Sequence, residues 1–233
     1  MKILILGNLG YIGPVLVKHL RRTFPESCLI GFDNAYFAAC LLKDEVLPEL
    51  NLNRQYYGDI RNISSEIFEN EKFDVVIQLA AISNDPMGKT FERQALEINT
   101  HATEVTAKMA KKSGVKSFIF ASSCSIYGIG GKKIKNESSE LSPQTVYARS
   151  KIESEIKLRN IADENFIITC LRFATACGLS PRMRLDLVLN DFVASAITNK
   201  KIEILSDGTP WRPLIDVKDM SRAIEWASNR EVD

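Results

Sequence analysis

The sequence predicts an α/β protein built on a doubly wound parallel sheet, followed by a small C-terminal lobe. Two observations carry this prediction. Apolar runs of strand length alternate with longer helical patterns, and the first run leads directly into a glycine-rich turn. Strands that are apolar along both faces are typical of a parallel sheet, whose right-handed crossover helices cover both sides. We therefore assign residues 1–172 to the sheet domain. Residues 173–233 form a partial lobe that is interleaved with the last strand and helix of that domain.

The predicted strands are short apolar runs, each followed by a polar or glycine residue. In chain order they are KILILG, SCLIGFD, RQYYGD, DVVIQLAA, SFIFASS, FIITCLRF and IEILS. Helical patterns are predicted over residues 12–22, 91–112 and 147–162, and a last helix carries Met220 and Trp226. Two polar loops, 128–142 and 179–184, follow strands. In a doubly wound fold such loops surround the ligand crevice.

Composition narrows the class of protein. The 233 residues are 45% hydrophobic and 25% charged, with a formal net charge of +1. These values are ordinary for a soluble globular chain and give no sign of a nucleic-acid or membrane partner. No apolar run reaches the length of a bilayer span. The five cysteines form no C-x-x-C pair, so we expect a cytoplasmic protein without structural disulfides, zinc or another metal.

The first predicted strand runs into G-N-L-G-Y-I-G, which has glycines at positions 7, 10 and 13. In a strand–loop–helix context, Gly7 permits the tight turn and Gly10 lets the backbone approach a pyrophosphate. Gly13 lets the helix pack closely on the strand. The helix N-terminus would then face the phosphates. The simpler interpretation is three turn glycines, but the order of strand, loop and helix favours a dinucleotide.

Two acidic residues at strand ends bear on the choice of dinucleotide. Asp33 follows the glycine loop at the distance expected for the acid that holds the adenosine ribose, and a carboxylate there favours NAD over NADP. Asn34 is neutral, and the next basic residue is Lys43. Asp59 could reach the adenine amino group or could cap a helix. Asp33 could also be an ordinary turn residue.

Tyr147 and Lys151 lie four apart in Y-A-R-S-K and so share one face of a helix. A lysine ammonium beside a phenol favours the phenolate. Lowering the tyrosine pKa by about 3 units requires roughly 4 kcal/mol, after which the pair could move protons near neutral pH. This spacing is also a frequent coincidence, so the assignment depends on the rest of the site.

Together with S-S-C-S-I-Y-G, L-A-A, D-I-R-N and a late W-R-P-L-I-D-V, these motifs resemble the extended short-chain dehydrogenase/reductase family, in its NAD-dependent nucleotide-sugar epimerase and dehydratase branch. The resemblance covers essentially the whole chain and implies a Rossmann-type NAD-binding domain. It implies that Tyr147 is the acid/base at a sugar hydroxyl. Lys151 would bind the nicotinamide ribose and lower the tyrosine pKa. Ser123 would be the active-site hydroxyl, with Ser122 the neighbour most easily confused with it.

The resemblance extends to further binding residues. Asn99 would brace the site and Phe173 would back the nicotinamide. The complete set implied to contact NAD is Gly7, Gly10, Tyr11, Ile12, Gly13, Asp33, Asn34, Asp59, Ile60, Leu79, Ala80, Ala81, Asn99, Ser122, Tyr147, Lys151 and Phe173. The residues implied to contact a nucleotide-diphosphate sugar are Cys124, Thr175 and Arg212.

Departures from the family pattern narrow the expected reaction. Sugar 4,6-dehydratases carry Asp and Glu after the active-site hydroxyl, whereas this chain carries Cys124 and Ser125. Neither can act as that pair, so we expect no dehydration. Cys124 could contact the sugar or be a small buried residue. Thr175 replaces the usual Asn, and Arg212 matches an arginine that clamps a diphosphate.

Three residues near these positions have less definite roles. Trp211 is expected to be a packing residue. The sequence leaves Arg182 and Arg184 undecided between surface charges and second phosphate ligands.

The resemblance predicts an NAD-dependent nucleotide-sugar epimerase similar to UDP-glucose 4-epimerase. Alternatives are a nucleotide-sugar dehydrogenase or 4-keto reductase using the same residues, or a non-catalytic dinucleotide-binding sensor. Family members commonly continue past the position of Asp233, so the substrate lobe is expected to be incomplete here. They often dimerise through two helices, which predicts a homodimer through residues 91–112 and 147–162, with buried core faces as the alternative.

Overall fold

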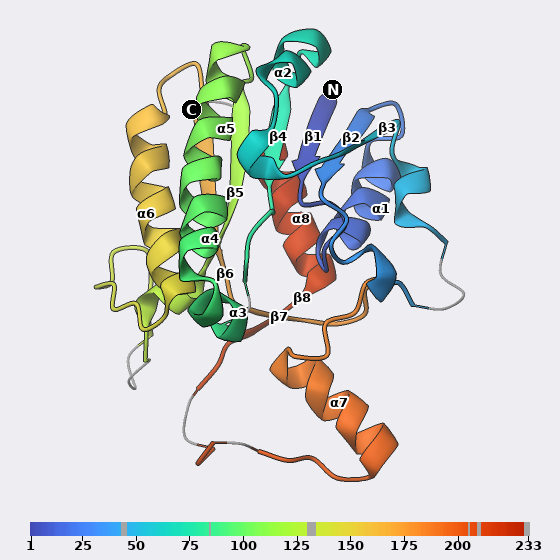
Figure 1. Ribbon diagram of the computed structural model, residues 1–233, viewed down its shortest axis with the longest axis vertical. Helices are drawn as coiled ribbons and strands as arrows, with labels where there is room; N and C mark the ends of the chain where they lie inside the picture. Colours follow the sequence, from blue (N-terminus) through green and yellow to red (C-terminus); the bar gives the residue numbers. More distant parts are fainter. Residues whose placement is uncertain (43–45, 84, 130–133, 205, 209–210, 231–233) are drawn as a thin grey trace.

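The computed structural model describes residues 1–42, 46–83, 85–129, 134–204, 206–208 and 211–230 (Figure 1). Its centre is a six-stranded parallel sheet with the order β3-β2-β1-β4-β5-β6. The strands are β1 (Lys2–Leu6), β2 (Cys28–Asp33), β3 (Arg54–Tyr57), β4 (Val75–Gln78), β5 (Ser117–Ser123) and β6 (Ile167–Phe173). The strand order reverses between β1 and β4, which places a ligand crevice at their carboxyl ends. The predicted doubly wound fold is confirmed.

Helices cover both faces of the sheet (Figure 1). One face is covered by α1 (Gly13–Thr23) and α8 (Val217–Ser228), and the other by α2 (Ser65–Glu71), α5 (Thr103–Lys112) and α6 (Val146–Ile161). Shorter elements line the loops: η1 (Ala38–Cys40), η2 (Pro48–Asn51), η3 (Ile60–Asn62), α3 (Asp85–Thr90), α4 (Glu92–Leu96) and η5 (Cys124–Tyr127). None of the helices in the described part of the chain has the length and apolarity needed to cross a membrane.

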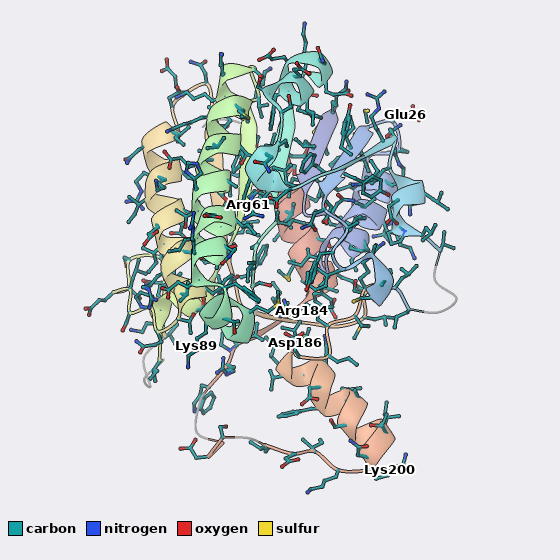
Figure 2. All side chains as sticks on the ribbon, viewed as in Figure 1. Glu26, Arg61, Lys89, Arg184, Asp186 and Lys200 are labelled. Carbon is teal, nitrogen blue, oxygen red and sulfur yellow. The ribbon has the colours of Figure 1, made fainter. Side chains whose placement is uncertain are left out.

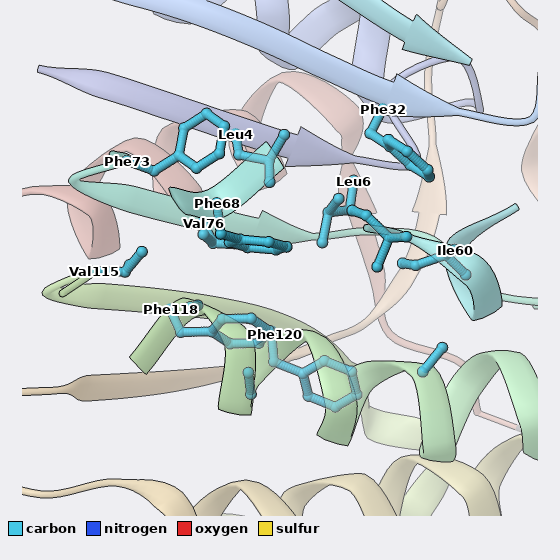
Figure 3. Close-up of a cluster of buried hydrophobic side chains, with 14 of the residues drawn as sticks. Leu4, Leu6, Phe32, Ile60, Phe68, Phe73, Val76, Val115, Phe118 and Phe120 are labelled. Carbon is cyan, nitrogen blue, oxygen red and sulfur yellow. The ribbon is translucent and has the colours of Figure 1, made fainter. Parts of the chain in front are cut away.

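Two hydrophobic cores lie on opposite faces of the sheet because alternate strand residues point in opposite directions. Leu4 and Leu6 pack with Phe68 and Phe118 on the α2–α5–α6 side (Figure 3). Ile3 and Ile5 belong to the other core, together with side chains of α1 and α8. Strands that are buried on both faces read as continuous apolar runs, which explains why six of the seven predicted strands are confirmed.

The predicted helix over residues 91–112 contains a wide turn. It consists of α4, the π-helical segment η4 (Glu97–Ala102) and α5 in immediate succession. A π-turn inserts an extra residue in the helical ladder and is frequent at functional sites. Asn99 lies within it and is almost completely buried, with 1% of its surface exposed.

The C-terminal lobe contains β7 (Thr175–Cys177), β8 (Leu214–Asp216) and α7 (Val188–Asn199). The two short strands pair in parallel with each other, apart from the main sheet. The prediction of a strand at IEILS is wrong for residues 202–204, which form no regular structure, and residue 205 lies outside the described residues. Ile202 and Ile204 are exposed, so this apolar run is not covered by a neighbouring element that could pair with it.

Candidate active site

The candidate residues gather at one edge of the sheet. Six of them lie at or just after the carboxyl ends of parallel strands, namely Gly7, Asp33, Asp59, Leu79, Ser123 and Phe173. The β5–β6 register places Ser123 directly beside Phe173. Parallel strands present their carboxyl ends on the same side, so chemistry scattered along the sequence is collected in one crevice.

The three glycines of the loop have different surroundings. Gly7 has a φ of +84°, and a Cβ there would lie 2.5 Å from the backbone nitrogen of Ala80. A Cβ on Gly13 would lie 2.0 Å from the carbonyl oxygen of Asn8. A Cβ on Gly10 would meet only the oxygen of Gly7, at 3.5 Å. Packing therefore requires Gly7 and Gly13, whereas Gly10 leaves open backbone of the kind that a pyrophosphate could approach.

Asp33 closes the side of this loop. Its Oδ2 accepts a hydrogen bond from the backbone N–H of Leu9 at 2.9 Å, and its Oδ1 accepts from the N–H of Ala35 at 2.8 Å. Burial raises the pKa of the Asp33 carboxyl, while these N–H donors and Arg182 oppose the rise. Asn34 makes a local turn bond, its Oδ1 accepting from Tyr36 at 3.0 Å.

Asp59 acts as a helix cap. Its carboxylate accepts from the backbone N–H of Arg61 at 2.9 Å and also pairs with the Arg61 guanidinium, which lowers the pKa of Asp59. The structure therefore shows the cap, and the contact of Asp59 with the adenine amino group stays a prediction. The side chain of Ile60 is buried in the core and leaves only its backbone for a ligand. Arg61, which is labelled in Figure 2, also pairs with Glu97.

Lys151 is buried beneath the tyrosine on the same helix face. Its Nζ donates to the carbonyl oxygen of Ala121 at 2.7 Å and lies 5.4 Å from the ring centroid of Tyr147. The ring of Phe120 is 4.5 Å from the same nitrogen. The N-cap Thr145, whose hydroxyl oxygen accepts from the N–H of Ala148, fixes the start of α6. The structure thus brings the predicted pair together at the carboxyl end of β5.

The ammonium of Lys151 is strongly desolvated. Burial lowers its pKa to about 7, and negative charge at Cys170 and Glu155 opposes this change. Burial also raises the pKa of the Cys170 thiol to about 12, so the thiol carries no charge near neutral pH. Glu155 is therefore the group whose charge sustains the protonated lysine in this range.

The two neighbouring serines have different surroundings. Ser123 is partly exposed, and its Oγ accepts from the backbone N–H of Ser125 at 3.2 Å. Ser122 is buried and donates its hydroxyl proton to Glu155 Oε1 at 2.5 Å. Of the two hydroxyls, only that of Ser123 lies at the surface of the crevice.

The segment Leu79–Ala81 passes directly beside the glycine loop. The backbone N–H groups of Leu79 and Ala80 both donate to the carbonyl oxygen of Leu6, at 2.9 and 3.0 Å. Asn99 then holds the next residue: its amide exchanges hydrogen bonds with the backbone of Ile82 at 2.8 and 3.0 Å. The same amide donates to Ser150 Oγ at 3.1 Å, which ties this segment to α6.

The three predicted substrate residues lie close together. Thr175 donates its backbone N–H to Pro213 at 3.0 Å, next to Arg212. Burial raises the pKa of the Cys124 thiol, and the positive charge of Arg212 acts against that rise. The thiol is consequently neutral near pH 7. The prediction that Trp211 packs in the interior is wrong, since 92% of its surface is exposed.

The loop after β7 crosses the crevice and contacts the glycine loop. The hydroxyl of Tyr11 donates to the carbonyl oxygen of Gly178 at 2.6 Å, and the amide of Asn190 donates to that hydroxyl at 3.3 Å. Ser180 Oγ donates to the Tyr11 carbonyl oxygen at 2.7 Å. Ile12 is the N-cap of α1. These contacts attach the glycine loop to the segment that follows β7.

Arg182 and Arg184, whose roles the sequence leaves open, have different surroundings in the structure. Arg184 is a partly exposed residue that pairs with Asp186 and donates to Ser83 Oγ at 2.8 Å (Figure 2). Arg182 is 2% exposed and donates through Nη2 to Glu49 Oε1 at 2.7 Å. Its Nε and Nη1 are buried without a hydrogen-bond partner. Buried donors normally have hydrogen-bond partners. The unpaired N–H groups of Arg182, near Asp33, therefore fit a site where a bound dinucleotide supplies the acceptors.

Sequence reasoning missed one group, the Glu155–Arg172 ion pair behind Ser122. The available signal was the spacing, because Glu155 follows Lys151 by four residues and so continues the helix face of Tyr147. Among the described residues, no group of three or more His, Cys, Asp or Glu side chains is arranged to hold a metal ion.

Known proteins with similar sequences are sugar-nucleotide enzymes. The human dTDP-D-glucose 4,6-dehydratase is 24% identical over 225 residues, which cover 95% of this chain and 64% of that protein. The UDP-glucose 4-epimerase of Pisum sativum is 30% identical over 186 residues, covering 76% of this chain and 53% of the relative. The chain thus spans less than two thirds of the length of either relative.

Solved structures agree over nearly the whole chain. A Thermotoga maritima UDP-glucose 4-epimerase with UDP-glucose has a TM-score of 0.82 at 26% identity, covering 98% of this chain and 74% of that one. MoeE5 in complex with UDP-glucose and NAD also has a TM-score of 0.82, at 25% identity, with 98% and 72% covered. A family model matches residues 3–233. With the glycine loop, Asp33 and the Tyr147–Lys151 pair in one crevice, the chain belongs to the NAD dependent epimerase/dehydratase family.

Proposed function

We propose that this chain is an NAD-dependent nucleotide-sugar epimerase that acts in the manner of UDP-glucose 4-epimerase. The observation that carries the proposal is the make-up of the crevice beside Tyr147. The tyrosine–lysine pair is held by Ala121 of β5, the strand that ends at Ser123, and the two residues that follow Ser123 are Cys124 and Ser125. Such a site can transfer a proton to and from a sugar hydroxyl, but it lacks the carboxyl pair that expels water.

The residues around the glycine loop suit NAD. The loop backbone at Gly10 and the N-terminus of α1 would hold the pyrophosphate, while Asp33 would accept from the adenosine ribose. The Leu79–Ala81 segment, Lys151 and Phe173 would surround the nicotinamide half, and Arg182 would supply donors at the adenosine side. When bound, NAD supplies a reversible hydride acceptor.

Tyr147 would exchange the proton of the reacting sugar hydroxyl. A protonated Lys151 lies close enough to its ring, at 5.4 Å from the centroid, to stabilise the phenolate. Ser123 would hold the reacting hydroxyl in line with that exchange. Arg212 and Thr175 would bind the diphosphate side of the substrate, so that binding energy retains a sugar that must turn over between the two transfers.

A turnover assay tests the proposal. Purified protein is incubated with NAD and, in turn, UDP-, GDP-, CDP- and dTDP-sugars, beginning with UDP-glucose, and the products are separated by chromatography. We expect the 4-epimer to form while NADH does not accumulate. Net NADH would indicate a dehydrogenase, and a 4-keto-6-deoxy product would indicate a dehydratase; either result would sink the epimerase assignment.

Replacing Tyr147 by Phe tests the acid/base role within that assay. We expect kcat to fall by about 10²- to 10⁴-fold, because the proton exchange is lost. NAD affinity, measured by calorimetry, should stay within about twofold of wild type, because the ring remains in place. Unchanged turnover would reject the catalytic assignment, and loss of NAD binding would show that the Tyr147 hydroxyl supports the cofactor site.

We also propose the division into a cofactor domain at 1–172 and a partial substrate lobe at 173–233, and a homodimer formed through residues 91–112 and 147–162. The exposed Ile156 on α6 supports a partner on that helix. The mass of the protein in solution tests the dimer.

A further inference from the structure

A buried polar network joins the active-site loop to α6. Ser122 donates to Glu155 Oε1 at 2.5 Å from one side. Arg172 donates from the other side, through Nη2 to Oε2 at 2.7 Å and through Nε at 3.1 and 3.2 Å. Glu155 is 7% exposed, so both partners are needed to satisfy its carboxylate.

Arg172 extends the network to the far end of the loop. Its Nη1 donates to the hydroxyl of Tyr127 at 2.8 Å, and its guanidinium lies 5.5 Å from the centroid of that ring. It also donates to the carbonyl oxygen of Glu137 at 3.3 Å. The network therefore holds residues 122 and 127, on both sides of the Ser123–Ser125 segment that carries the active-site hydroxyl.

The same carboxylate lies one helical turn beyond Lys151. The groups that face the lysine nitrogen are the rings of Tyr147 and Phe120, the carbonyl oxygen of Ala121, the Cys170 thiol and Glu155. Near neutral pH the thiol is protonated, and Glu155 is then the negative charge in this set. Arg172 binds this carboxylate through both of its oxygens in a buried position.

We propose that Glu155 and Arg172 are a positioning pair for the proposed epimerase reaction: the carboxylate favours the protonated form of Lys151, and the guanidinium fixes the loop that presents Ser123. Neither residue touches the reacting atoms. The inference rests on the proposed function for its effect on turnover, but its electrostatic half can be measured without any turnover.

Glu155→Gln tests the electrostatic half. It keeps the shape of the side chain and removes its charge, so Lys151 loses its proton more readily. We expect the Lys151 ammonium, followed by NMR with labelled lysine, to titrate about one pH unit lower, and kcat on UDP-glucose to fall about five- to tenfold at neutral pH with little change in KM. The Lys151 signal is identified by its absence from Lys151→Met.

The matched control is Glu153→Gln, which removes the same charge from an exposed position of the same helix. It should leave both the titration and kcat unchanged. An unshifted Lys151 midpoint in Glu155→Gln, or an equal shift in Glu153→Gln, would overturn the electrostatic half. If no nucleotide sugar is converted, the proposed function fails while this titration still decides the inference.

Tyr127→Phe tests the positioning half and leaves the Glu155–Arg172 pair intact, so it remains informative where Glu155→Gln does not fold. Losing one hydrogen bond to Arg172 should lower kcat about two- to tenfold with an unchanged Lys151 titration. Wild-type kcat in this variant would overturn the positioning role of Arg172.

Discussion

The helices α7 and α8 are equally long, yet they differ in how their apolar residues are covered. In α8, the side chains of Val217, Met220 and Ile224 are at most 3% exposed and complete the core beneath the sheet. In α7, Leu189, Val193 and Ile197 recur every four residues and so share one helix face, but they are 37%, 52% and 66% exposed. Figure 1 shows α7 standing away from the sheet that α8 covers.

The sheet domain, which includes α8, buries the apolar faces of its helices. The C-terminal lobe, which includes α7, leaves an apolar helix face exposed. An amphipathic helix gains its stability mainly by burying its apolar face. Within the described residues α7 buries little of that face, so the sheet and its flanking helices carry the stability of the chain. The site residues that depend on the cofactor side are therefore held more firmly than those beside Arg212.

The largest expected effect comes from comparing one isoleucine on each helix. Ile224→Ala should lower the free energy of unfolding by about 2–5 kcal/mol, because it leaves a cavity in a packed core. Ile197→Ala should change it by less than about 0.5 kcal/mol, because the side chain is mostly in solvent. Urea unfolding of the two variants measures both values. Equal losses would break the comparison and show that α7 is covered in solution.

The glycine loop also contains a closely packed position and an open one, Gly7 and Gly10. Gly7→Ala should lower the free energy of unfolding by about 1–3 kcal/mol, because its Cβ would overlap the backbone of Ala80 at a positive φ. Gly10→Ala should fold normally but bind NAD more weakly, because its methyl group would occupy the approach of the pyrophosphate.

Thermal unfolding with and without NAD separates these two outcomes. Gly88→Ala is the control, since a Cβ there meets nothing within 4 Å. Full NAD affinity in Gly10→Ala would remove this glycine from the cofactor site.

The smallest effect concerns the charge buried on the cofactor side. Between the folded pKa of Lys151, about 7, and its ordinary value of 10.5, the unfolded chain binds more protons than the folded one. The free energy of unfolding contributed by this group therefore rises with pH through that window, and no cost remains above it. Lys151→Met should raise stability at neutral pH by about 1–2 kcal/mol, limited by the unpaired Ala121 carbonyl, while turnover is lost.

Urea unfolding across this pH range measures the prediction. The gain should vanish at the alkaline end, and Lys112→Met, at an exposed lysine, should show no such slope. A gain that does not depend on pH would mean that burial of the lysine charge is not its source.

The sheet was predictable from the sequence because its strands are buried on both faces and read as apolar runs. The short strands β7 and β8 were not, since three residues such as Thr175–Cys177 give no periodicity. The run at Ile202 and Ile204 has the right composition for a strand, but in the described part of the chain both side chains are exposed. Apolar composition alone cannot distinguish a covered run from an exposed one.

The candidate site was predictable as far as local spacing reaches. The glycines and the Tyr147–Lys151 pair are close in sequence, so their patterns are visible. The burial of Arg182 and the Glu155–Arg172 bond depend on segments that meet only in the fold, Glu49 with residue 182 and α6 with β6. The π-turn at Asn99 is likewise set by its bonds to Ile82 and Ser150 rather than by helix propensity.

One phenol oxygen has a mechanical consequence. The hydroxyl of Tyr11 is bonded at once to Gly178 and to Asn190, and Asn190 lies in the first turn of α7. Helix α7, whose apolar side chains are mostly exposed, is thus tied to the loop that would cradle the phosphates. We expect a displacement of that loop to move the first turn of α7 as well. Because the helix is rigid, a small rotation of its first turn moves its C-terminal end over a larger distance.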